Sequence, residues 1–287
     1  MPELPEVEVV KLSLKNSIQS KKINKVIVFN RNLRFKIHKK FESYLKKKNI
    51  INIQRFSKYI LFYLDNKSIL VLHLGMSGTI HILKNNRKNN FTNSSFYSSP
   101  LLPKKHNHVI IFFDNLKIIY NDPRRFGFLK IIENEEKLKI FFKNYGPEPF
   151  DKRFNLDYLK KNLKNKTKNI KNYLLDQSFV SGIGNIYANE ILFLCKINPF
   201  KQSGKLNKKD FKNIIFYSKK VLNHAIKNGG SSIQNFMNTD GNRGYFQDSF
   251  KVYQRDKLKC LSKKCGGIIK KKMITNRSVF YCNLCQK

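Results

Sequence analysis

The sequence predicts an α+β protein in which a β-rich amino-terminal domain precedes a helical domain and a cysteine-containing end. Short apolar runs fill residues 22–133, helical periodicity takes over beyond residue 154, and four of the five cysteines lie beyond residue 259. A chain of 287 residues, 41% of them apolar, is long enough for about two domains with buried cores.

The β-rich domain is expected over residues 1–135. It should open with a helix near 5–20, and the later runs "YILFYL", "SILVLHLG" and "HVIIFF" have the length and the β-branched or aromatic content of strands. Within this domain, residues 84–105 are polar and low in complexity, which predicts a mobile loop.

A linker over residues 136–153, marked by "NYGPEP", leads to the helical domain. This domain is expected over 154–248, with helices in "FNLDYLKKNLKN", "NEILFLCKIN" and "KDFKNIIFYSKKVLNHAIKNGG" and a Gly-, Ser- and Asn-rich loop from 229 to about 248. Residues 249–287 form the cysteine-containing end.

The charge balance favours a polyanionic partner. With 57 Lys and Arg against 19 Asp and Glu, the formal net charge is +38, and nucleic acid is the leading candidate. The joint abundance of Lys, Asn and Ile is also typical of a genome of biased base composition, so charge alone supports such a partner only moderately. No apolar run reaches the ~18 residues of a membrane span, and the start lacks a signal peptide, which predicts a soluble, cytoplasmic protein.

The cysteines of the last segment have the spacing of a metal site. Four residues separate Cys260 from Cys265, two separate Cys282 from Cys285, and a hairpin-like segment joins the two pairs. Four thiolates satisfy the tetrahedral coordination of zinc with no open position, so these four cysteines are the predicted ligands. The spacing therefore predicts one structural zinc ion, with unliganded buried thiols as the alternative. Cys195, in an apolar helical stretch, is expected to be a core residue.

The amino end, "MPELPEVE", concentrates carboxylates in a basic chain. Removal of Met1 would leave Pro2 with a free secondary amine, and an α-amino group titrates near about 7.7–8.0, well below a lysine at about 10.4. Pro2 would then be a nucleophile that forms an iminium with a sugar carbon, and Glu3 could move the protons. On spacing alone, the favoured alternative is a helix start with prolines and acids in the first turn.

Four further motifs place single residues in turns or at element ends. "SKYILFYL" puts Lys58 at the start of a strand, "HLGMSG" exposes Met76, and "NDPRRFG" presents Arg124 beside Phe126, a pair suited to phosphate contact and to wedging into a base stack. "GIGNIYANE" precedes a helix and is a candidate phosphate cradle, although it lacks the ending of a nucleotide-binding P-loop. Each motif alone is equally typical of an ordinary structural turn.

In this order, the segments "MPELPEVE", "SKYIL", "HLGMSG", "HNHV", "DPRRFG", "YGPEP", "GIGNIYANE", "GYFQ" and the cysteine motif resemble the formamidopyrimidine-DNA glycosylase family, bacterial enzymes that excise oxidised purines such as 8-oxoguanine. The resemblance implies an amino-terminal β-sandwich, a carboxy-terminal helical domain with a helix-two-turn-helix element and a zinc-finger hairpin, and damaged double-stranded DNA between them. It also implies a glycosylase that is at the same time an abasic-site lyase, acting as a monomer.

The resemblance also implies residue roles. Pro2 would form the Schiff base with the deoxyribose, Glu3 would be the acid and base, and Glu6 would support the site. Lys58 would act at β-elimination and Arg277 at δ-elimination. Met76, Arg124 and Phe126 would fill the hole left by the extruded nucleotide. The phosphates near the lesion would be contacted by His106, Lys171, Asn185 and Arg277. The loop at about 229–248 would close over the everted base.

Three features depart from the family pattern. The first cysteine pair is separated by four residues where the family usually has two, which puts the hydrogen bonds around the metal ligands in doubt. The 84–105 loop is long, which leaves the placement of His106 and His108 open, and Thr167 stands where a lysine is common. The alternatives are an endonuclease VIII-like glycosylase for oxidised pyrimidines and a non-catalytic DNA-binding protein that keeps the scaffold.

Overall fold

The computed structural model describes residues 2–84, 104–231 and 244–287. The chain divides into two compact units, residues 1–143 with 228–247, and residues 144–227 with 248–287. Most of the loops expected at 84–105 and 229–248 lie outside the described residues. Within the described ranges, the helices are all too short or too polar to cross a bilayer.

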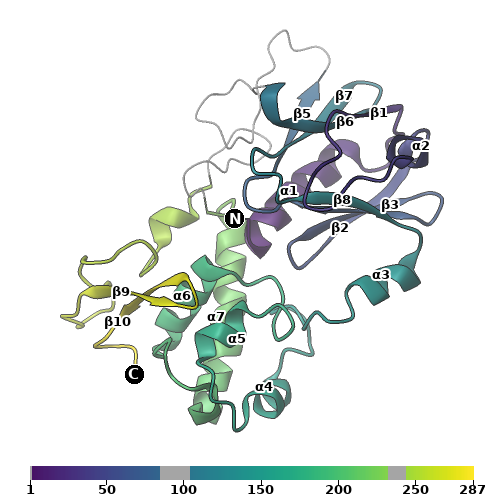
Figure 1. Cartoon of the computed structure of the whole chain (residues 1–287). Helices are drawn as coiled ribbons and strands as arrows, with labels where there is room; N and C mark the ends of the chain where they lie inside the picture. The colour runs from purple at the N-terminus through teal and green to yellow at the C-terminus, as the bar shows by residue number, and fades with distance from the viewer. Residues whose placement is uncertain (1, 85–103, 232–243) are drawn as a thin grey trace. The chain divides into compact units, whose positions relative to one another are not determined.

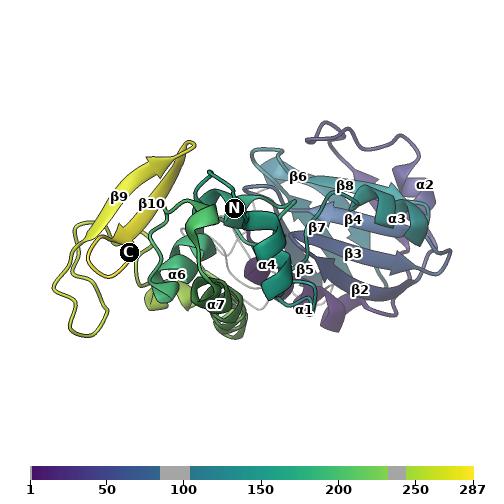
Figure 2. The same cartoon turned by 90° about the horizontal axis from the view of Figure 1, so that it is seen from below.

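The first unit is a β-sandwich built from two antiparallel four-stranded sheets (Figure 1). One sheet has the order β1-β6-β7-β5, with bounds Lys25–Val28, Asn107–Phe112, Leu116–Asn121 and Thr79–Lys84. The other has the order β2-β3-β4-β8, with bounds Ile50–Phe56, Tyr59–Leu64, Ile69–His73 and Phe128–Ile132. Figure 2 shows β2, β3 and β4 side by side in this second sheet.

One hydrophobic core joins the two sheets. It takes alternate side chains from both, such as Ile60 and Phe62 of β3 and Ile111 of β6, together with Val10 and Leu14 of helix α1, Leu4–Ile18. Strands β3 and β4 are buried along nearly their whole length, whereas β2, at the edge of the same sheet, also has exposed residues. Two short helices, α2 (Phe41–Leu45) and α3 (Glu135–Phe141), complete the unit.

Helix α1 begins where its sequence specifies. Glu3 is the N-cap of a capping box with Glu6, Pro5 lies in the first turn, and the buried residues Leu4, Val7, Val10, Leu14 and Ile18 recur at helical spacing to form one apolar stripe. This stripe packs against β2. The helix therefore presents its amino end, with Pro2 and Glu3, at a defined place on the sandwich.

The second unit is helical and ends in a β-hairpin. Its helices are α4 (Leu156–Leu163), α5 (Ile170–Leu175), α6 (Asn185–Cys195) and α7 (Lys208–Lys227). Helix α6 is buried on nearly all sides because it packs against α5, α7 and strand β10, as Figure 1 shows. The hairpin consists of β9 (Ile269–Ile274) and β10 (Arg277–Cys282). The predicted fold class, a β-sandwich followed by a helical domain with a cysteine hairpin, is confirmed.

Residues 228–247 group with the first unit, although the sequence favours a helical domain extending to 248. The physical reason is a buried contact: Ser231 donates its backbone N–H and its hydroxyl to Glu6 Oε1 at 2.8 and 2.9 Å. A hydrogen bond to a buried carboxylate is among the stronger contacts a loop can make, so it ties this segment to helix α1.

Candidate active site and nucleic-acid interface

The amino end of helix α1 carries two buried carboxylates beside Pro2. Glu3 and Glu6 are 3% and 2% exposed, whereas Pro2 is partly exposed. Glu6 Oε2 accepts the backbone N–H of Glu3 at 2.8 Å, and its other oxygen accepts both donors of Ser231. Glu6 is therefore held from two sides and fixes the backbone that carries Glu3, while Pro2 remains accessible.

A third acid of this helix has a structural role. Glu8 forms ion pairs with Lys11 at 2.5 Å and with Arg55 Nε at 2.7 Å. Burial opposes ionisation of Glu8, but the hydrogen bonds and positive charges of Lys11 and Arg55 outweigh it and lower its pKa. Arg55 also donates to the carbonyl of Ser57 at 3.0 Å, so this cluster supports the turn that contains Lys58.

Lys58 lies in the two-residue turn between β2 and β3. Phe56 pairs with Tyr59 across this turn, Ser57 has a φ of 54°, and Lys58 is only 7% exposed. Burial, together with the charges of Lys58 and Arg34, lowers the pKa of His73 to about 4. His73 is therefore neutral at pH 7, and its Nδ1 accepts the backbone N–H of Gly75 at 3.1 Å.

The residues predicted as wedges come together on one side of the sandwich. Met76, in the turn Leu74–Gly78 between β4 and β5, and Phe126, in the turn 122–127 between β7 and β8, are each 43% exposed. The Arg124 guanidinium lies 4.6 Å from the centre of the Phe126 ring, at cation–π distance. All three side chains line a cavity of about 700 Å³ together with Asn32, Leu33, Arg34, His73, Gly75 and Arg125.

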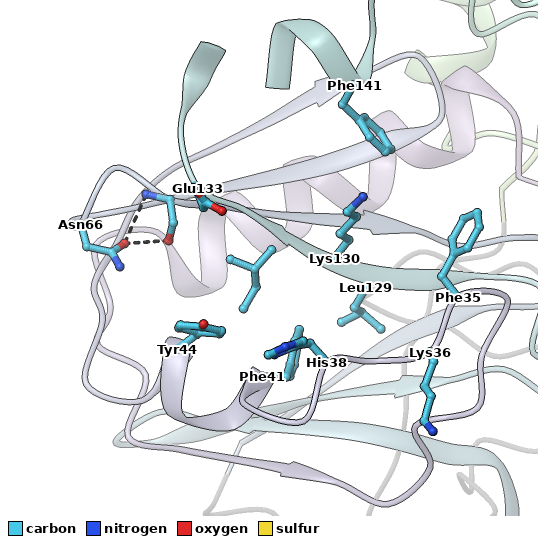
Figure 3. Close-up of a pocket in the computed structure, with 12 residues that line it drawn as sticks. Phe35, Lys36, His38, Phe41, Tyr44, Asn66, Leu129, Lys130, Glu133 and Phe141 are labelled. Carbon is cyan, nitrogen blue, oxygen red and sulfur yellow. Dashed lines mark hydrogen bonds between the residues drawn. The ribbon is translucent and has the colours of Figure 1, made fainter. Parts of the chain in front are cut away.

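A second cavity of similar size, about 680 Å³, lies on the same unit (Figure 3). Its lining includes the aromatic side chains of Phe35, Phe41, Tyr44 and Phe141, and the hydroxyl of Ser68, another lining residue, donates to Asn66 Oδ1. None of the residues predicted from the sequence lines it. The two cavities have similar volumes, so the cavity beside Met76 is the candidate site because predicted site residues line it.

The two histidines of "HNHV" have different surroundings. His106 ends a 3₁₀ turn, Lys104–His106, and burial together with the charges of Lys105 and His108 lowers its pKa. His108 is buried, and its Nε2 lies 2.7 Å from the carbonyl oxygen of Asp122. Within the first unit, His108 is thus part of the framework of the turn that carries Arg124.

In the second unit, Lys171 and Asn185 converge on strand β10. Lys171 Nζ and Asn185 Nδ2 both donate to the carbonyl of Ser278, at 2.9 and 3.1 Å. Arg277, the preceding residue, is exposed beside a turn in which Thr275 and Asn276 have φ values of 46° and 60°. Lys171, which is fully buried, and Asn185 therefore meet at the carbonyl of Ser278, next to Arg277 in the sequence and at the amino terminus of α6.

The cysteines form one compact cluster. Their four sulfur atoms all lie within 4.8 Å of one another, with separations of 3.6 Å between Cys265 and Cys282 and 3.8 Å between Cys260 and Cys285. Four thiolates at ~2.3 Å from a central ion would be about 3.8 Å apart in a tetrahedron, so the donor set fits a metal ion. Gly267 belongs to this cradle, because a Cβ there would lie 2.7 Å from Cys282 Sγ.

The wide first cysteine loop supplies its own hydrogen bonds. Ser262 donates its backbone N–H to Cys260 Sγ at 3.5 Å, and its hydroxyl lies 3.7 Å from Cys285 Sγ. The extra residues between Cys260 and Cys265 thus provide contacts of the kind that stabilise thiolates around a metal. Cys195, by contrast, is buried, and burial raises the pKa of its thiol.

Two buried acids were not identified from the sequence. Asp122 is fully buried between the turns that carry Met76 and Arg124. Glu190, 2% exposed in α6, accepts the backbone N–H groups of Lys251, Val252 and Tyr253 at 2.8 to 3.0 Å. Burial raises the pKa of Glu190, and these three donors partly offset that effect. Asp122 opens the motif "DPRRFG" and Glu190 ends the motif "GIGNIYANE". The sequence feature that could have identified them is that acidic residues are scarce in so basic a chain.

The fold and these sites define a class of protein, the DNA glycosylases. The model of the formamidopyrimidine-DNA glycosylase N-terminal domain matches residues 1–129, and that of the H2TH domain matches residues 145–237. The formamidopyrimidine-DNA glycosylases of Rickettsia bellii and of a Wolbachia from Drosophila simulans are 41% and 39% identical over 288 and 287 residues, covering all of each chain. The chain belongs to the formamidopyrimidine-DNA glycosylase family.

Solved structures agree. A Lactococcus lactis Fpg in complex with DNA containing an abasic site is 31% identical, covers all of both chains and has a TM-score of 0.87. A point mutant of that protein in complex with DNA containing Fapy-dG has the same identity, coverage and TM-score. The predicted family is thus confirmed in sequence and in fold.

Proposed function

We propose that this enzyme is a bifunctional DNA glycosylase and abasic-site lyase that excises oxidised purines, such as 8-oxoguanine and formamidopyrimidines, from duplex DNA. The observation that carries the proposal is the amino end of α1, where an accessible Pro2 precedes Glu3 and Glu6, two buried carboxylates in a chain of net charge +38. The Lactococcus lactis relatives, in complex with abasic-site and Fapy-dG DNA, support the substrate class.

Pro2 is the proposed nucleophile once Met1 is removed. Its secondary amine attacks C1′ of the deoxyribose, a bond forms between nitrogen and carbon, and the bond from C1′ to the base breaks as the base leaves with a proton. Glu3 supplies a proton to the sugar ring oxygen as the ring opens to an iminium, and it later accepts a proton. Glu6 holds the Glu3 backbone through its 2.8 Å hydrogen bond, so it positions the acid without reacting.

The iminium is an electron sink for the strand-cleavage steps. Loss of a proton from C2′ expels the 3′ phosphate in β-elimination, and loss of a proton from C4′ then expels the 5′ phosphate in δ-elimination. We assign Lys58, buried in the β2–β3 turn, to the first step and Arg277, exposed in the hairpin, to the second. His106, Lys171 and Asn185 are assigned to phosphates near the lesion.

The base must leave the stack before Pro2 can reach C1′, at a cost of a few kcal/mol. Met76 and Phe126, exposed on neighbouring turns, are the proposed wedges, and Arg124 is the proposed partner of the orphaned base. The zinc ion of the four-cysteine cluster would be structural, because four thiolates leave no open position. We further propose that the enzyme acts as a monomer in the cytoplasm, with the chromosome.

The decisive experiment is borohydride reduction during reaction with duplex DNA containing one 8-oxoguanine, followed by peptide mapping. The adduct is expected on Pro2, and Glu3→Gln should lower excision by about a hundredfold or more, since positioned acid–base groups contribute 10²–10⁴-fold. Glu133→Gln, at an exposed acid of the same unit, is the matched control and should cleave like the wild type. An adduct on any side chain would overturn the assignment of Pro2.

The same assay separates the purine enzyme from its pyrimidine relative. Excision of 8-oxoguanine is expected to exceed that of thymine glycol in matched duplexes, because Met76, Arg124 and Phe126 form the set associated with the purine enzymes. A strong preference for thymine glycol would favour the endonuclease VIII-like alternative. Absence of cleavage on either duplex would favour a non-catalytic DNA-binding protein.

A further inference from the structure

The turns that carry the proposed wedges share one buried carboxylate. The first wedge turn, Leu74–Gly78, carries Met76, and the second wedge turn, residues 122–127, carries Arg124 and Phe126. Asp122 opens the second turn and is fully buried. Its position at the junction of two exposed turns gives it no direct access to DNA, so its effect must pass through its neighbours.

Four donors occupy both oxygens of the Asp122 carboxylate. Oδ1 accepts from the Ser77 hydroxyl at 2.5 Å and from the Arg124 backbone N–H at 3.2 Å. Oδ2 accepts from the Tyr120 hydroxyl and from the Gly127 backbone N–H, both at 2.9 Å. One donor therefore belongs to the first wedge turn, two belong to the second, and one belongs to β7.

Only an ionised carboxylate can accept all four hydrogen bonds. An amide at the same place has a single acceptor oxygen, and its NH₂ group would face two donors. Tyr120 remains a donor at physiological pH, because burial and the Asp122 charge raise its pKa well above the ordinary value. A buried donor left without an acceptor is unfavourable, so the two exposed turns would change their relative positions.

The backbones of the two wedge turns are also in direct contact. A Cβ at Gly75, whose φ is 66°, would lie 2.4 Å from the Gly127 nitrogen, so the turns approach as closely as glycine permits. The Arg124 N–H also lies 3.2 Å from Ser77 Oγ, and Nε2 of His108 in β6 lies 2.7 Å from the carbonyl of Asp122. Movement of one turn is thus coupled to movement of the other through Asp122.

We propose that Asp122 is a positioning residue that makes the two wedge turns insert into DNA as one element. The inference rests on the proposed function of Met76, Arg124 and Phe126. Because Asp122 holds the Arg124 backbone, it also sets where the guanidinium meets the base opposite the lesion, so the discrimination between opposite bases depends on this buried acid.

The test is the Asp122→Asn variant of the full chain, assayed in single turnover on three duplexes. Two contain 8-oxoguanine, opposite cytosine or opposite adenine, and one contains a preformed abasic site. Excision of 8-oxoguanine should fall by about tenfold to a hundredfold, since small misplacements of positioned groups have effects of that size. The rate ratio between the two opposite bases should move toward unity, while cleavage at the abasic site should change by less than about threefold.

Two further variants complete the design. Asp114→Asn, in the turn between β6 and β7, is the matched control and should keep both rates and the ratio, because Asp114 lies outside both wedge turns. Ser77→Ala removes one donor to Asp122 and should shift the ratio in the same direction by a smaller factor. If circular dichroism shows that Asp122→Asn does not fold, Ser77→Ala decides the question.

The outcomes separate the two proposals. A wild-type enzyme that cleaves none of the duplexes refutes the proposed function. An active wild type, with an Asp122→Asn variant that keeps its opposite-base ratio or loses all three activities equally, overturns the positioning role of Asp122 and leaves the proposed function intact.

Discussion

The β-sandwich and the cysteine finger, residues 249–287, are stabilised by different means. The sandwich has a large continuous core drawn from two sheets and α1. The finger contributes to two small clusters: one combines Val252, Cys260, Ile269, Phe280 and Cys282 with Phe193 of α6, and the other consists of Ile274, Val279 and Tyr281. Segments below about 40 residues rarely bury enough apolar area to fold without a metal or disulfides. The finger is therefore expected to depend on the proposed zinc ion, whereas the sandwich is expected to fold without it.

Metal removal should separate the two regions most clearly. Chelation is expected to unfold the finger, because structural zinc contributes apparent binding free energies of about 10–16 kcal/mol. Affinity for damaged duplex should then be lost while the sandwich stays folded, as measured by fluorescence anisotropy and by the β-sheet signal in circular dichroism. The comparison would be wrong if affinity were unchanged after zinc removal verified by metal analysis.

Acid should destabilise the sandwich through His73 and His81. Burial lowers the pKa of His81 to about 3, and burial with nearby charges lowers that of His73 to about 4. Because these folded pKa values lie below the unfolded value of about 6.5, the stabilisation is complete above that pH and is lost as the pH falls toward 4. Each histidine contributes a slope of up to about 1.4 kcal/mol per pH unit.

The measurement is urea unfolding of the sandwich as a function of pH. His81→Gln should reduce the slope between about pH 6.5 and pH 4, where the neutral histidine is the native form. Equal slopes in the variant and the wild type would mean that His81 does not stay neutral in the folded sandwich.

The smallest effect concerns the attachment of the finger to α6. Glu190→Gln retains the shape of the side chain but replaces one of the oxygens that accept from Lys251, Val252 and Tyr253. At least one backbone donor would lose its partner, so we expect the free energy of unfolding to fall by about 1–3 kcal/mol. Zinc-saturated protein should show lower protection of these amides in hydrogen exchange, with Glu133→Gln as the control. Unchanged protection would count against an anchoring role for Glu190.

Local signals in the sequence predict the elements well. The start of α1 follows from the capping residues around Pro5, the strands follow from short apolar runs rich in β-branched and aromatic residues, and the hairpin follows from the cysteine spacing. The candidate wedges Met76 and Phe126 lie in turns as the motifs predict, and both are exposed. These features depend on residues close together in the chain, so a single sequence is sufficient.

The long-range contacts that hold the site residues in place could not be predicted from local signals. Asp122 and Ser77 are 45 residues apart, Lys171 and Ser278 are 107 apart, and Glu6 and Ser231 are 225 apart. Periodicity carries no information about which distant groups will meet. The motifs therefore point to residues of proposed chemistry, such as Glu3, and the family resemblance adds Glu6. Asp122, which holds the turns that carry Met76 and Arg124, was not predicted.

The amino-acid order of this chain was enough to predict the strand-rich and helical regions, the longer helices α1, α4, α6 and α7, and the family, because those depend on propensities and motifs over a few neighbouring positions. The short helices α2, α3 and α5 were not predicted. Which buried acids stabilise which loops was settled by folding, since a carboxylate in an apolar interior must find donors wherever the packed chain brings them. Glu6, Asp122 and Glu190 each accept backbone N–H groups, and Glu6 and Asp122 also accept hydroxyl groups, at contacts that exist only once each unit has folded around them.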